Sequence, residues 1–483
     1  MDSQQLTQHI AATWHDSVIP RLVDYIAIPA KSPLFDPEWA AHGDIDRVVA
    51  LAVDWARAQP IAGMKLEVAR LPGLTPTIMI DIPAFEGIVA PKPLLERDIK
   101  IPAPKTVLIY GHLDKQPEMT GWREGLGPWQ PVIEDGKLYG RGGADDGYAI
   151  FSALSAIAAL QAQQVAHPRC VVLIETSEES GSPDLPAYMQ ALSPRIGTPD
   201  LVIALDSGCG DYARLWGTAS LRGMIGGTLR VQVLSEGVHS GDASGVVPSS
   251  FRIVRQLLSR IEDESSGRIL PPEFHAAIPE ERERQAAQAA QILGRTLHEK
   301  FPFHGSTRPV TDDLTQLVLN RAWRPTLSIT GADGLPPLKS AGNVLRPNTD
   351  LKLSLRLPPT VDAPAAAVTL KQLLERDPPH GATVKFEIEQ AATGWSAPKL
   401  APWLATALER ASHHHYERAA AFLGEGVTIP FMSMLGQQYP EAQFLITGVL
   451  GPHSNAHGPN EFLHLDYAQK LTCCVAEVLA SLK

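Results

Sequence analysis

The chain has 483 residues, 44% of them hydrophobic and 20% charged, which is the composition of an ordinary soluble globular protein. Its length exceeds what one hydrophobic core usually supports, so two domains are expected. The net charge of −11 and the lack of a basic cluster argue against a nucleic-acid partner. The N-terminus lacks the features of a secretion signal, no run of about 18 apolar residues predicts a membrane span, and the few cysteines show no CxxC spacing. These features predict a cytoplasmic protein with reduced thiols and no membrane partner.

The N-terminal part of the chain alternates helix and strand patterns. Residues 5–26 and 45–58 have apolar side chains at helical spacing. Short apolar runs of strand length follow at 77–82, 106–112, 170–177 and 200–206, with a helix candidate at 148–163. Buried apolar strands that alternate with helices predict an α/β domain with a largely parallel sheet.

The middle of the chain has a different pattern. Strands are predicted at 221–235, 351–358 and 382–389, and helices at 249–261 and 365–377. These elements are five of the six in the strand–helix–strand–strand–helix–strand order of a ferredoxin-like α+β module, which we therefore predict here. The intervening residues 262–325 are rich in charge and in helix formers, which indicates an insertion on that module.

From about residue 392 the pattern of the first domain returns. A helix is predicted from residue 402, a strand at 443–449 and a last helix at 466–482. We therefore predict one discontinuous, mostly parallel α/β domain, formed by residues 1–212 and 392–483. The inserted ferredoxin-like α+β domain would comprise residues 213–391.

Five residues on separate segments are candidate metal ligands. Three of them are expected just after the carboxyl ends of strands, the edge of an open α/β sheet where ligands bind. A fourth stands in GRGGADDG (140–147) and the fifth in SNAHGPNE (454–461). Two histidines and three carboxylates suffice for two divalent ions if one carboxylate bridges them. The five candidates are His112, Asp145, Glu179, Asp206 and His457.

Each of these segments also has a structural interpretation. An isolated HxD is more often a hydrogen-bonded pair, ADDG is commonly a turn, and two adjacent glutamates usually lie on a solvated surface. The combination of all of them in this order at strand ends favours a metal centre. Asp114 would then accept the second N–H of His112, and Glu178, adjacent to a ligand, is a candidate general base.

The motifs GHLDKQP, LYGRGGADDGYA, ETSEESGS, ALDSG and NAHGPNE resemble the metal-site motifs of the M20 family of metallopeptidases. The resemblance covers nearly the whole chain and is closest to the carnosine dipeptidase-like branch. It implies two divalent ions, zinc with manganese or cobalt as alternatives, with His112 and Asp206 on one ion, Glu179 and His457 on the other, and Asp145 between them. It further implies that Glu178 is the general acid and base, that Asp114 orients His112, and that the Asp145–Asp146 peptide is cis.

The inserted domain resembles the lid of the same family. EGVHSGDASGVVP (236–248) is similar to a segment whose histidine, here His239, reaches the active site of a dimer partner. Asn343 and Arg356 match lid residues that hold the substrate carboxylate or the scissile carbonyl. The resemblance thus implies a homodimer joined through the lid. The structural alternatives are a turn histidine for His239 and an exposed strand residue for Arg356.

The chain also departs from its relatives. Where several of them have REGGSIP, this chain has GEGVTIP (424–430), with Gly424 in place of arginine and Thr428 still offering a hydroxyl to a substrate. We expect a dipeptidase that acts on short peptides with a free C-terminal carboxylate. The alternatives are an N-acyl amino acid amidohydrolase that uses the same site and a non-catalytic binding protein on the same scaffold.

Overall fold

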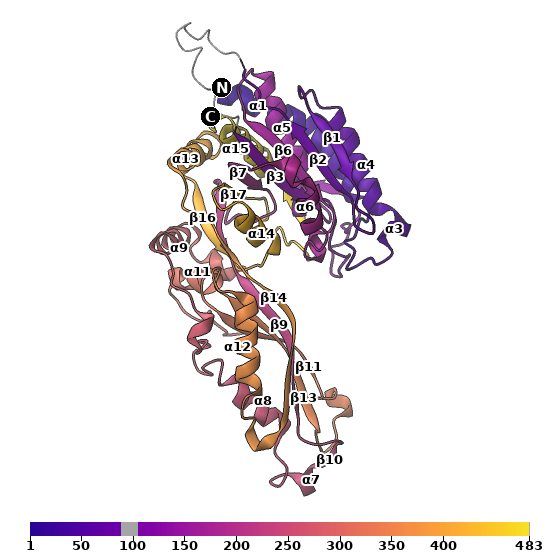
Figure 1. The fold of residues 1–483 in the computed structure, drawn as a ribbon, viewed down its shortest axis with the longest axis vertical. Coiled ribbons are helices and arrows are strands. Elements are labelled where there is room, and N and C mark those ends of the chain that lie inside the picture. The colour runs from indigo at the N-terminus through magenta and orange to yellow at the C-terminus, as the bar shows by residue number, and fades with distance from the viewer. Residues whose placement is uncertain (88–104, 483) are drawn as a thin grey trace.

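The computed structural model describes residues 1–87 and 105–482. Figure 1 shows an elongated molecule in which a layered α/β body carries a long, narrower arm. Within the described residues the body contains a sheet of six strands in the order β1–β2–β6–β3–β7–β17. The last four run parallel, whereas β2 is antiparallel to both of its neighbours. The bounds are β1 (Lys65–Ala69), β2 (Thr77–Ile82), β3 (Thr106–His112), β6 (Arg169–Glu175), β7 (Leu201–Ala204) and β17 (Gln443–Ile446). This confirms the predicted α/β fold with a mostly parallel central sheet.

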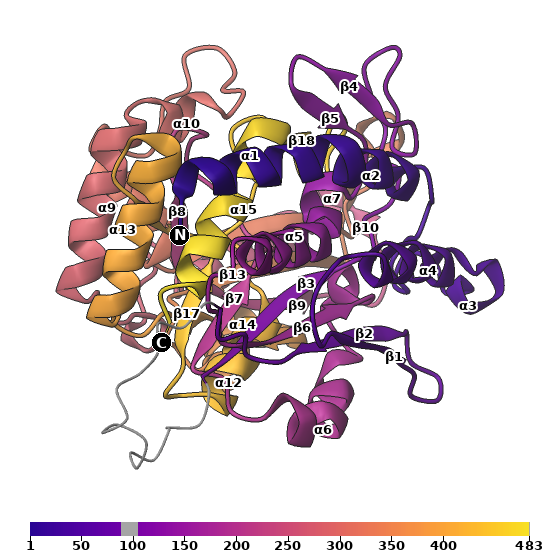
Figure 2. The same ribbon diagram turned by 90° about the horizontal axis from the view of Figure 1, so that it is seen from above.

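Helices cover both faces of this sheet because successive strand residues point to opposite sides. In β3, Val107 and Ile109 belong to the core that includes α5, while Leu108 and Tyr110 belong to the core with α6 and α14. The helix α5 is apolar all round and buried, in contact with α1 and α15 (Figure 2). The helices of the body are α1 (Ser3–Thr13), α2 (Ile19–Ile26), α3 (Trp39–His42), α4 (Asp44–Arg57), α5 (Tyr148–Ala162), α6 (Leu185–Ile196), α13 (Pro402–Tyr416), α14 (Pro430–Gln438) and α15 (Leu465–Leu479).

The C-terminal part of the chain completes the body. Strand β17 pairs in parallel with β7, and α15 packs against α5. A small antiparallel sheet, β18 (Phe462–His464), β5 (Lys137–Tyr139) and β4 (Val132–Glu134), joins the two distant parts of the sequence again. The buried ion pair between Arg141 and Glu461 lies beside this sheet. These contacts bring the segment with His457 back to the N-terminal part.

The arm contains the antiparallel sheet β11–β13–β9–β14, with α8 and α12 packed on one face. In chain order the elements are β9 (Gly223–Gln232), α8 (Ser250–Leu258), β11 (Thr326–Asp333), β13 (Asn348–Leu357), α12 (Ala363–Glu375) and β14 (Thr383–Ala392). Strand β11 was not predicted, because its apolar alternation is short (Leu327 and Ile329) and this edge strand is largely exposed. The tip of the arm carries β10 (Val238–His239), α7 (Ser240–Ala243) and β12 (Val344–Leu345) (Figure 1).

The segment 262–325 lies at the junction of body and arm. It forms α9 (Glu280–Leu293), α10 (Thr296–Glu299) and α11 (Leu314–Ala322), and α9 and α11 contact β16 (Ala421–Glu425). Strand β16 pairs with β8 (Trp216–Leu221), which in turn pairs with β15 (Trp395–Ser396). The sequence suggested an insertion on the α+β module; Ile269 and Phe274 do belong to the core of the arm, whereas Ala289 and Leu319 belong to the core of the body. Helices α9 and α11 of this segment therefore pack on the small sheet of β8, β15 and β16, where the chain passes between body and arm.

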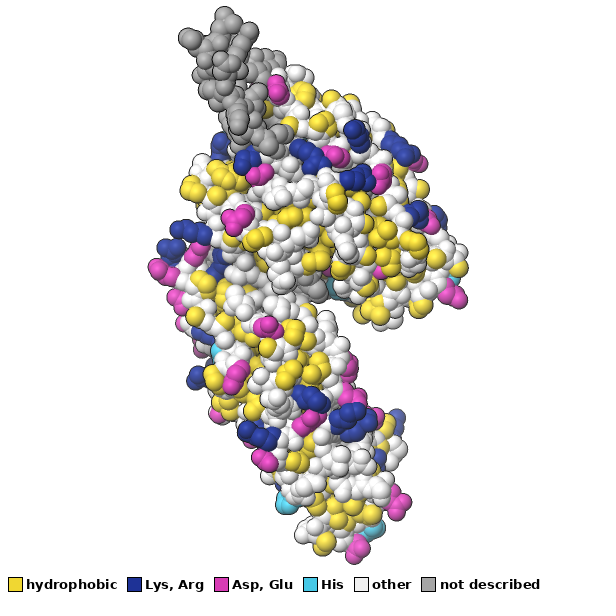
Figure 3. Space-filling view, viewed as in Figure 1, with side chains coloured by type: hydrophobic (Ala, Val, Ile, Leu, Met, Phe, Trp, Pro, Cys, Tyr) yellow, Lys and Arg dark blue, Asp and Glu magenta, His cyan; other side chains and the backbone are white. Residues whose placement is uncertain are grey.

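The surface carries charged residues of both signs in mixture, and it is recessed where the arm meets the body (Figure 3). None of the helices within residues 1–87 and 105–482 is long and apolar enough to cross a membrane. The described residues include four buried cysteines that form no disulfide, namely Cys170, Cys209, Cys473 and Cys474.

Candidate metal centre

The candidate ligands come together at the carboxyl edge of the central sheet. His112 is the last residue of β3, Glu179 lies in the short helical turn after β6, and Asp206 follows β7 by two residues. Asp145 lies in the turn that leads into α5, and its peptide bond to Asp146 is cis. Parallel neighbours end at the same edge of a sheet, so the strand order β6–β3–β7 alone places three of these side chains next to one another.

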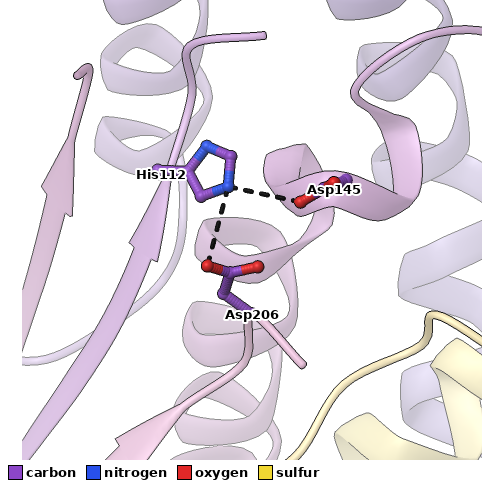
Figure 4. A group of neighbouring side chains, drawn as sticks. All are labelled: His112, Asp145 and Asp206. Atoms are coloured by element: carbon purple, nitrogen blue, oxygen red, sulfur yellow. Dashed lines mark ion pairs between the residues drawn. The ribbon is translucent and has the colours of Figure 1, made fainter. Parts of the chain in front are cut away.

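The first group of ligands consists of His112, Asp145 and Asp206. His112 Nε2 lies 3.4 Å from Asp145 Oδ1 and 3.8 Å from Asp206 Oδ2. Figure 4 shows the imidazole directed at both carboxylates from the end of β3. The three ligand atoms lie within 4.8 Å of one another, which is close enough for a single ion to contact them all.

The second group shares Asp145 with the first. His457 Nε2 lies 3.0 Å from Asp145 Oδ2 and 3.3 Å from Glu179 Oε2. The side chain of His457 is 56% exposed, so this group faces solvent on one side. Gln116 Nε2 donates a hydrogen bond of 2.6 Å to Glu179 Oε2, a contact that the sequence did not suggest. Asp145 therefore directs Oδ1 toward the first group and Oδ2 toward the second.

The side chains present fit divalent metal ions. His112 Nε2 and Glu179 Oε1 are buried and have no hydrogen-bond partner among the described residues. Buried polar atoms of this kind are rare in proteins unless a ligand, a water molecule or an ion satisfies them. Imidazole nitrogens and carboxylate oxygens are ligands that zinc and related ions accept. Two groups of three that share one carboxylate offer places for two ions.

The charges at the site support the same interpretation. Burial raises the pKa of Asp206 to about 6, and burial together with the Asp206 carboxylate raises the pKa of Glu178 well above its ordinary value. Burial alone would also raise the pKa of Asp145, but the adjacent imidazoles of His112 and His457 hold it far below the ordinary value. Crowded, buried carboxylates disfavour their ionised forms unless positive charge is nearby, and a cation supplies that charge.

Asp114 holds the turn that presents Glu178 and Glu179. Its carboxylate accepts hydrogen bonds from the backbone N–H of Glu178 (3.1 Å) and of Glu179 (2.9 Å). His112 Nδ1 lies 3.5 Å from the Asp114 carboxylate and 3.1 Å from the Asp114 carbonyl oxygen. The hydrogen bond of His112 Nδ1 thus goes to the backbone carbonyl oxygen of Asp114, while the Asp114 carboxylate fixes the following pair of glutamates.

Glu178 lies beside the ligand groups and belongs to neither of them. Its Oε2 is 4.0 Å from His112 Nε2, and its side chain is 15% exposed. A carboxylate beside the candidate ligands, with access to solvent, can exchange protons with a bound molecule.

The predicted substrate contacts fall into two separate places. Arg356 Nη1 donates a hydrogen bond of 2.9 Å to Thr428 Oγ1 at the base of the arm. His239 and Asn343 are neighbours at the tip of the arm, where the N–H of Ser240 donates to the Asn343 carbonyl oxygen. Figure 1 shows that this tip lies at the end of the molecule opposite to the body. Within one chain, His239 and Asn343 are thus not brought to the metal centre.

The glycine at position 424 has a packing reason in this chain. A Cβ atom placed on Gly424 would lie 2.6 Å from Ala322 Cβ and 2.6 Å from Ser220 Oγ. Helix α11 from the junction segment occupies this space. The arginine of several relatives cannot be accommodated here without displacing that helix. The same helix carries Arg321, which forms an ion pair with Glu425, a contact that local sequence patterns do not reveal.

Residues 108–481 match the model of peptidase family M20/M25/M40. The chain belongs to this peptidase family. It is 24% identical over 379 residues to a cysteinylglycine-S-conjugate dipeptidase of Corynebacterium striatum, covering 77% of this chain and 80% of that protein. It is 23% identical over 464 residues to the human β-Ala-His dipeptidase, covering 93% and 88%. The solved structure of the Saccharomyces cerevisiae dipeptidase Dug1p has the same fold, with a TM-score of 0.71, 21% identity and coverage of 99% and 98%. The family resemblance noted in the motifs is thereby confirmed.

Proposed function

We propose that this M20/M25/M40 family member is a di-metal exopeptidase that cleaves dipeptides or short peptides with a free C-terminal carboxylate. The observation that carries the proposal is the pair of ligand groups that share Asp145, with Glu178 free beside them. The relatives named as dipeptidases support the choice of substrate.

His112, Asp145 and Asp206 would hold one ion, and Asp145, Glu179 and His457 the other. When bound, two divalent ions would polarise the scissile carbonyl and favour the ionised form of water. Zinc suits this set of ligands, and manganese or cobalt are alternatives. Asp114 would orient His112 and hold the backbone of Glu178 and Glu179. The ligand side chains would then need little rearrangement when the ions bind.

Glu178 would move the proton. Its carboxylate takes a proton from the attacking water molecule and later gives that proton to the departing amine. Burial of this side chain within a crowd of carboxylates favours the protonated form, which is the form required for the second step. One residue therefore acts as base and then as acid.

Arg356 and Thr428 would bind the C-terminal carboxylate of the substrate. A guanidinium group binds a carboxylate through two parallel hydrogen bonds, and the existing bond to Thr428 Oγ1 orients that group. This contact would select substrates that end in a free carboxylate.

The arm would act as a lid and as the dimer contact. We propose a catalytic domain of residues 1–212 and 392–483 and an inserted lid domain of residues 213–391, whose helices α9 and α11 pack on the body. His239, exposed at the tip, would reach the metal centre of a partner subunit and stabilise the negatively charged oxygen that forms during hydrolysis, with Asn343 beside it. The separation of tip and metal centre within one chain supports this arrangement.

An N-acyl amino acid amidohydrolase is the second candidate function, because Arg356 and Thr428 suit the carboxylate of an N-acyl amino acid equally well. A panel of dipeptides and of N-acetyl amino acids, assayed with metal-reconstituted protein, distinguishes the two. We expect kcat/KM to be higher for the dipeptides. Hydrolysis of the N-acetyl amino acids alone would contradict the dipeptidase assignment, and activity on neither class would favour a non-catalytic binding protein.

A further inference from the structure

Three arginines from separate segments converge on the loop that follows β16. Arg222 connects β8 to β9, Arg321 lies near the end of α11, and Arg356 lies in β13. A Cβ atom placed on Gly426, in the middle of this loop, would lie 3.2 Å from Arg222 Nη2 and 3.3 Å from Arg321 Cγ. Thr428 accepts from Arg356 Nη1 at 2.9 Å and donates to the Arg222 carbonyl oxygen at 2.7 Å. The three guanidinium groups therefore surround one short stretch of backbone.

The three residues Arg222, Arg321 and Arg356 are called the arginine cluster below. Their hydrogen bonds leave some of their N–H donors free. Arg222 donates from Nε to the Gly426 carbonyl oxygen at 3.3 Å and from Nη1 to Thr326 Oγ1 at 3.0 Å. Each guanidinium has five N–H donors. Among the described residues, neither Arg222 Nη2 nor Arg356 Nη2 has a hydrogen-bond acceptor. Planar groups with free, partly buried donors are suited to bind carboxylate oxygens.

Positive charge in the arginine cluster exceeds negative charge. Within the described part of the chain, Glu425 is the only carboxylate in an ion pair with any of the three arginines, and its partner is Arg321. Three guanidinium groups and one carboxylate leave two positive charges without a partner. Burial, together with the like charges of Arg356 and Arg321, lowers the pKa of Arg222 to about 10, as expected of an uncompensated group.

The cluster adjoins the metal centre. Glu425 Oε1 would lie 3.3 Å from a Cβ atom placed on Gly208, which is two residues beyond Asp206. The end of β16, which leads into the loop that the arginines surround, therefore packs against the segment that carries a candidate metal ligand. With its C-terminal carboxylate on Arg356, as proposed above, a bound peptide would have its C-terminal residue beside this cluster.

We propose that the arginine cluster binds two anionic groups of one substrate, and that the enzyme prefers dipeptides whose C-terminal residue is aspartate or glutamate. This inference rests on the proposed dipeptidase function. A neutral C-terminal residue brings one carboxylate to a site with two uncompensated positive charges. Aspartate or glutamate brings a second carboxylate and balances the site. In a partly buried environment an uncompensated charge raises the free energy of the complex. Peptides that end in aspartate or glutamate should therefore bind more tightly than peptides that end in a neutral residue.

The test compares Ala-Glu with Ala-Gln, which have nearly the same shape and differ by one charge. We expect kcat/KM for Ala-Glu to exceed that for Ala-Gln on the order of tenfold at low salt, and the ratio to shrink as salt screens the charges. Arg222→Gln removes one positive charge, and the ratio should fall to near one. Arg222→Lys keeps the charge and should retain most of the ratio. Arg376→Gln, an equal charge change at an exposed site on the arm, should leave the ratio unchanged.

Binding of the free amino acids separates this inference from the proposed function. Calorimetry with metal-reconstituted protein should show tighter binding of L-glutamate than of L-glutamine, whether or not any dipeptide is cleaved. Absence of dipeptide hydrolysis with selective glutamate binding would contradict the dipeptidase function and support the anion site. Equal rates for Ala-Glu and Ala-Gln, or a preference that survives in Arg222→Gln, would overturn the proposed role of the cluster.

Discussion

Replacement of Glu178 by Gln is expected to lower kcat by about two to four orders of magnitude while metal binding is retained. Glutamine has nearly the same size as glutamate and keeps one acceptor oxygen, but it cannot take a proton from water or return it to an amine. Glu178 belongs to neither ligand group, so both ions should remain bound. Steady-state rates and elemental analysis of the same preparation measure the two properties together.

Two further variants make this result specific to Glu178. Glu179→Gln alters the adjacent residue, which belongs to a ligand group, so it should lower metal content as well as activity. Glu124→Gln makes the same chemical change in an exposed loop and should leave both unchanged. Activity close to that of the unmodified enzyme in Glu178→Gln would contradict the assigned role.

Two inactive variants, Glu178→Gln and His239→Ala, are expected to restore activity when their subunits are combined. If His239 acts across the dimer, a mixed dimer contains one complete site, with Glu178 from one chain and His239 from the other. Random exchange at equal concentrations makes about half of the dimers mixed, so about a quarter of the original activity should return. His239→Ala alone should lose about two to three orders of magnitude in kcat, because it removes a donor that stabilises the negatively charged oxygen.

A matched pair of variants controls for non-specific reactivation. Glu178→Gln and Glu179→Gln both alter the metal centre of their own chain, so no mixed dimer of these two has a complete site. No activity should return in that mixture. Full activity of His239→Ala, or no recovery in the first mixture despite confirmed subunit exchange, would show that the tip of the arm does not serve the partner's site.

The sequence predicted the parts of the site that depend on local pattern and strand order. His112, Glu179 and Asp206 follow apolar runs that become buried parallel strands, and the edge at which such strands end is common to all of them. The motifs around Asp145 and His457 carried the family resemblance that joined the distant segments. Local pattern and the resemblance together therefore located all five candidate ligands.

Features that depend on packing between distant segments were not predictable in this way. Strand β11 is a largely exposed edge whose apolar alternation is limited to Leu327 and Ile329, and α11 packs on the body instead of on the arm. The arginine cluster arises because that helix brings Arg321 to the loop after β16, about a hundred residues further along the chain. In the sequence, Gly424 stands where several relatives have an arginine. In the structure, its lack of a side chain allows α11 to pack against β16.

The central claim is that the two ligand groups sharing Asp145 hold two ions, and metal stoichiometry tests it most directly. Protein depleted of metal, reconstituted with zinc and freed of excess ion should contain close to two equivalents per chain by elemental analysis, as expected for two groups of three ligands. Asp145→Ala, which removes the carboxylate common to both groups, should lower the content of both ions. A content of one equivalent or less in the unmodified protein would contradict the dinuclear centre.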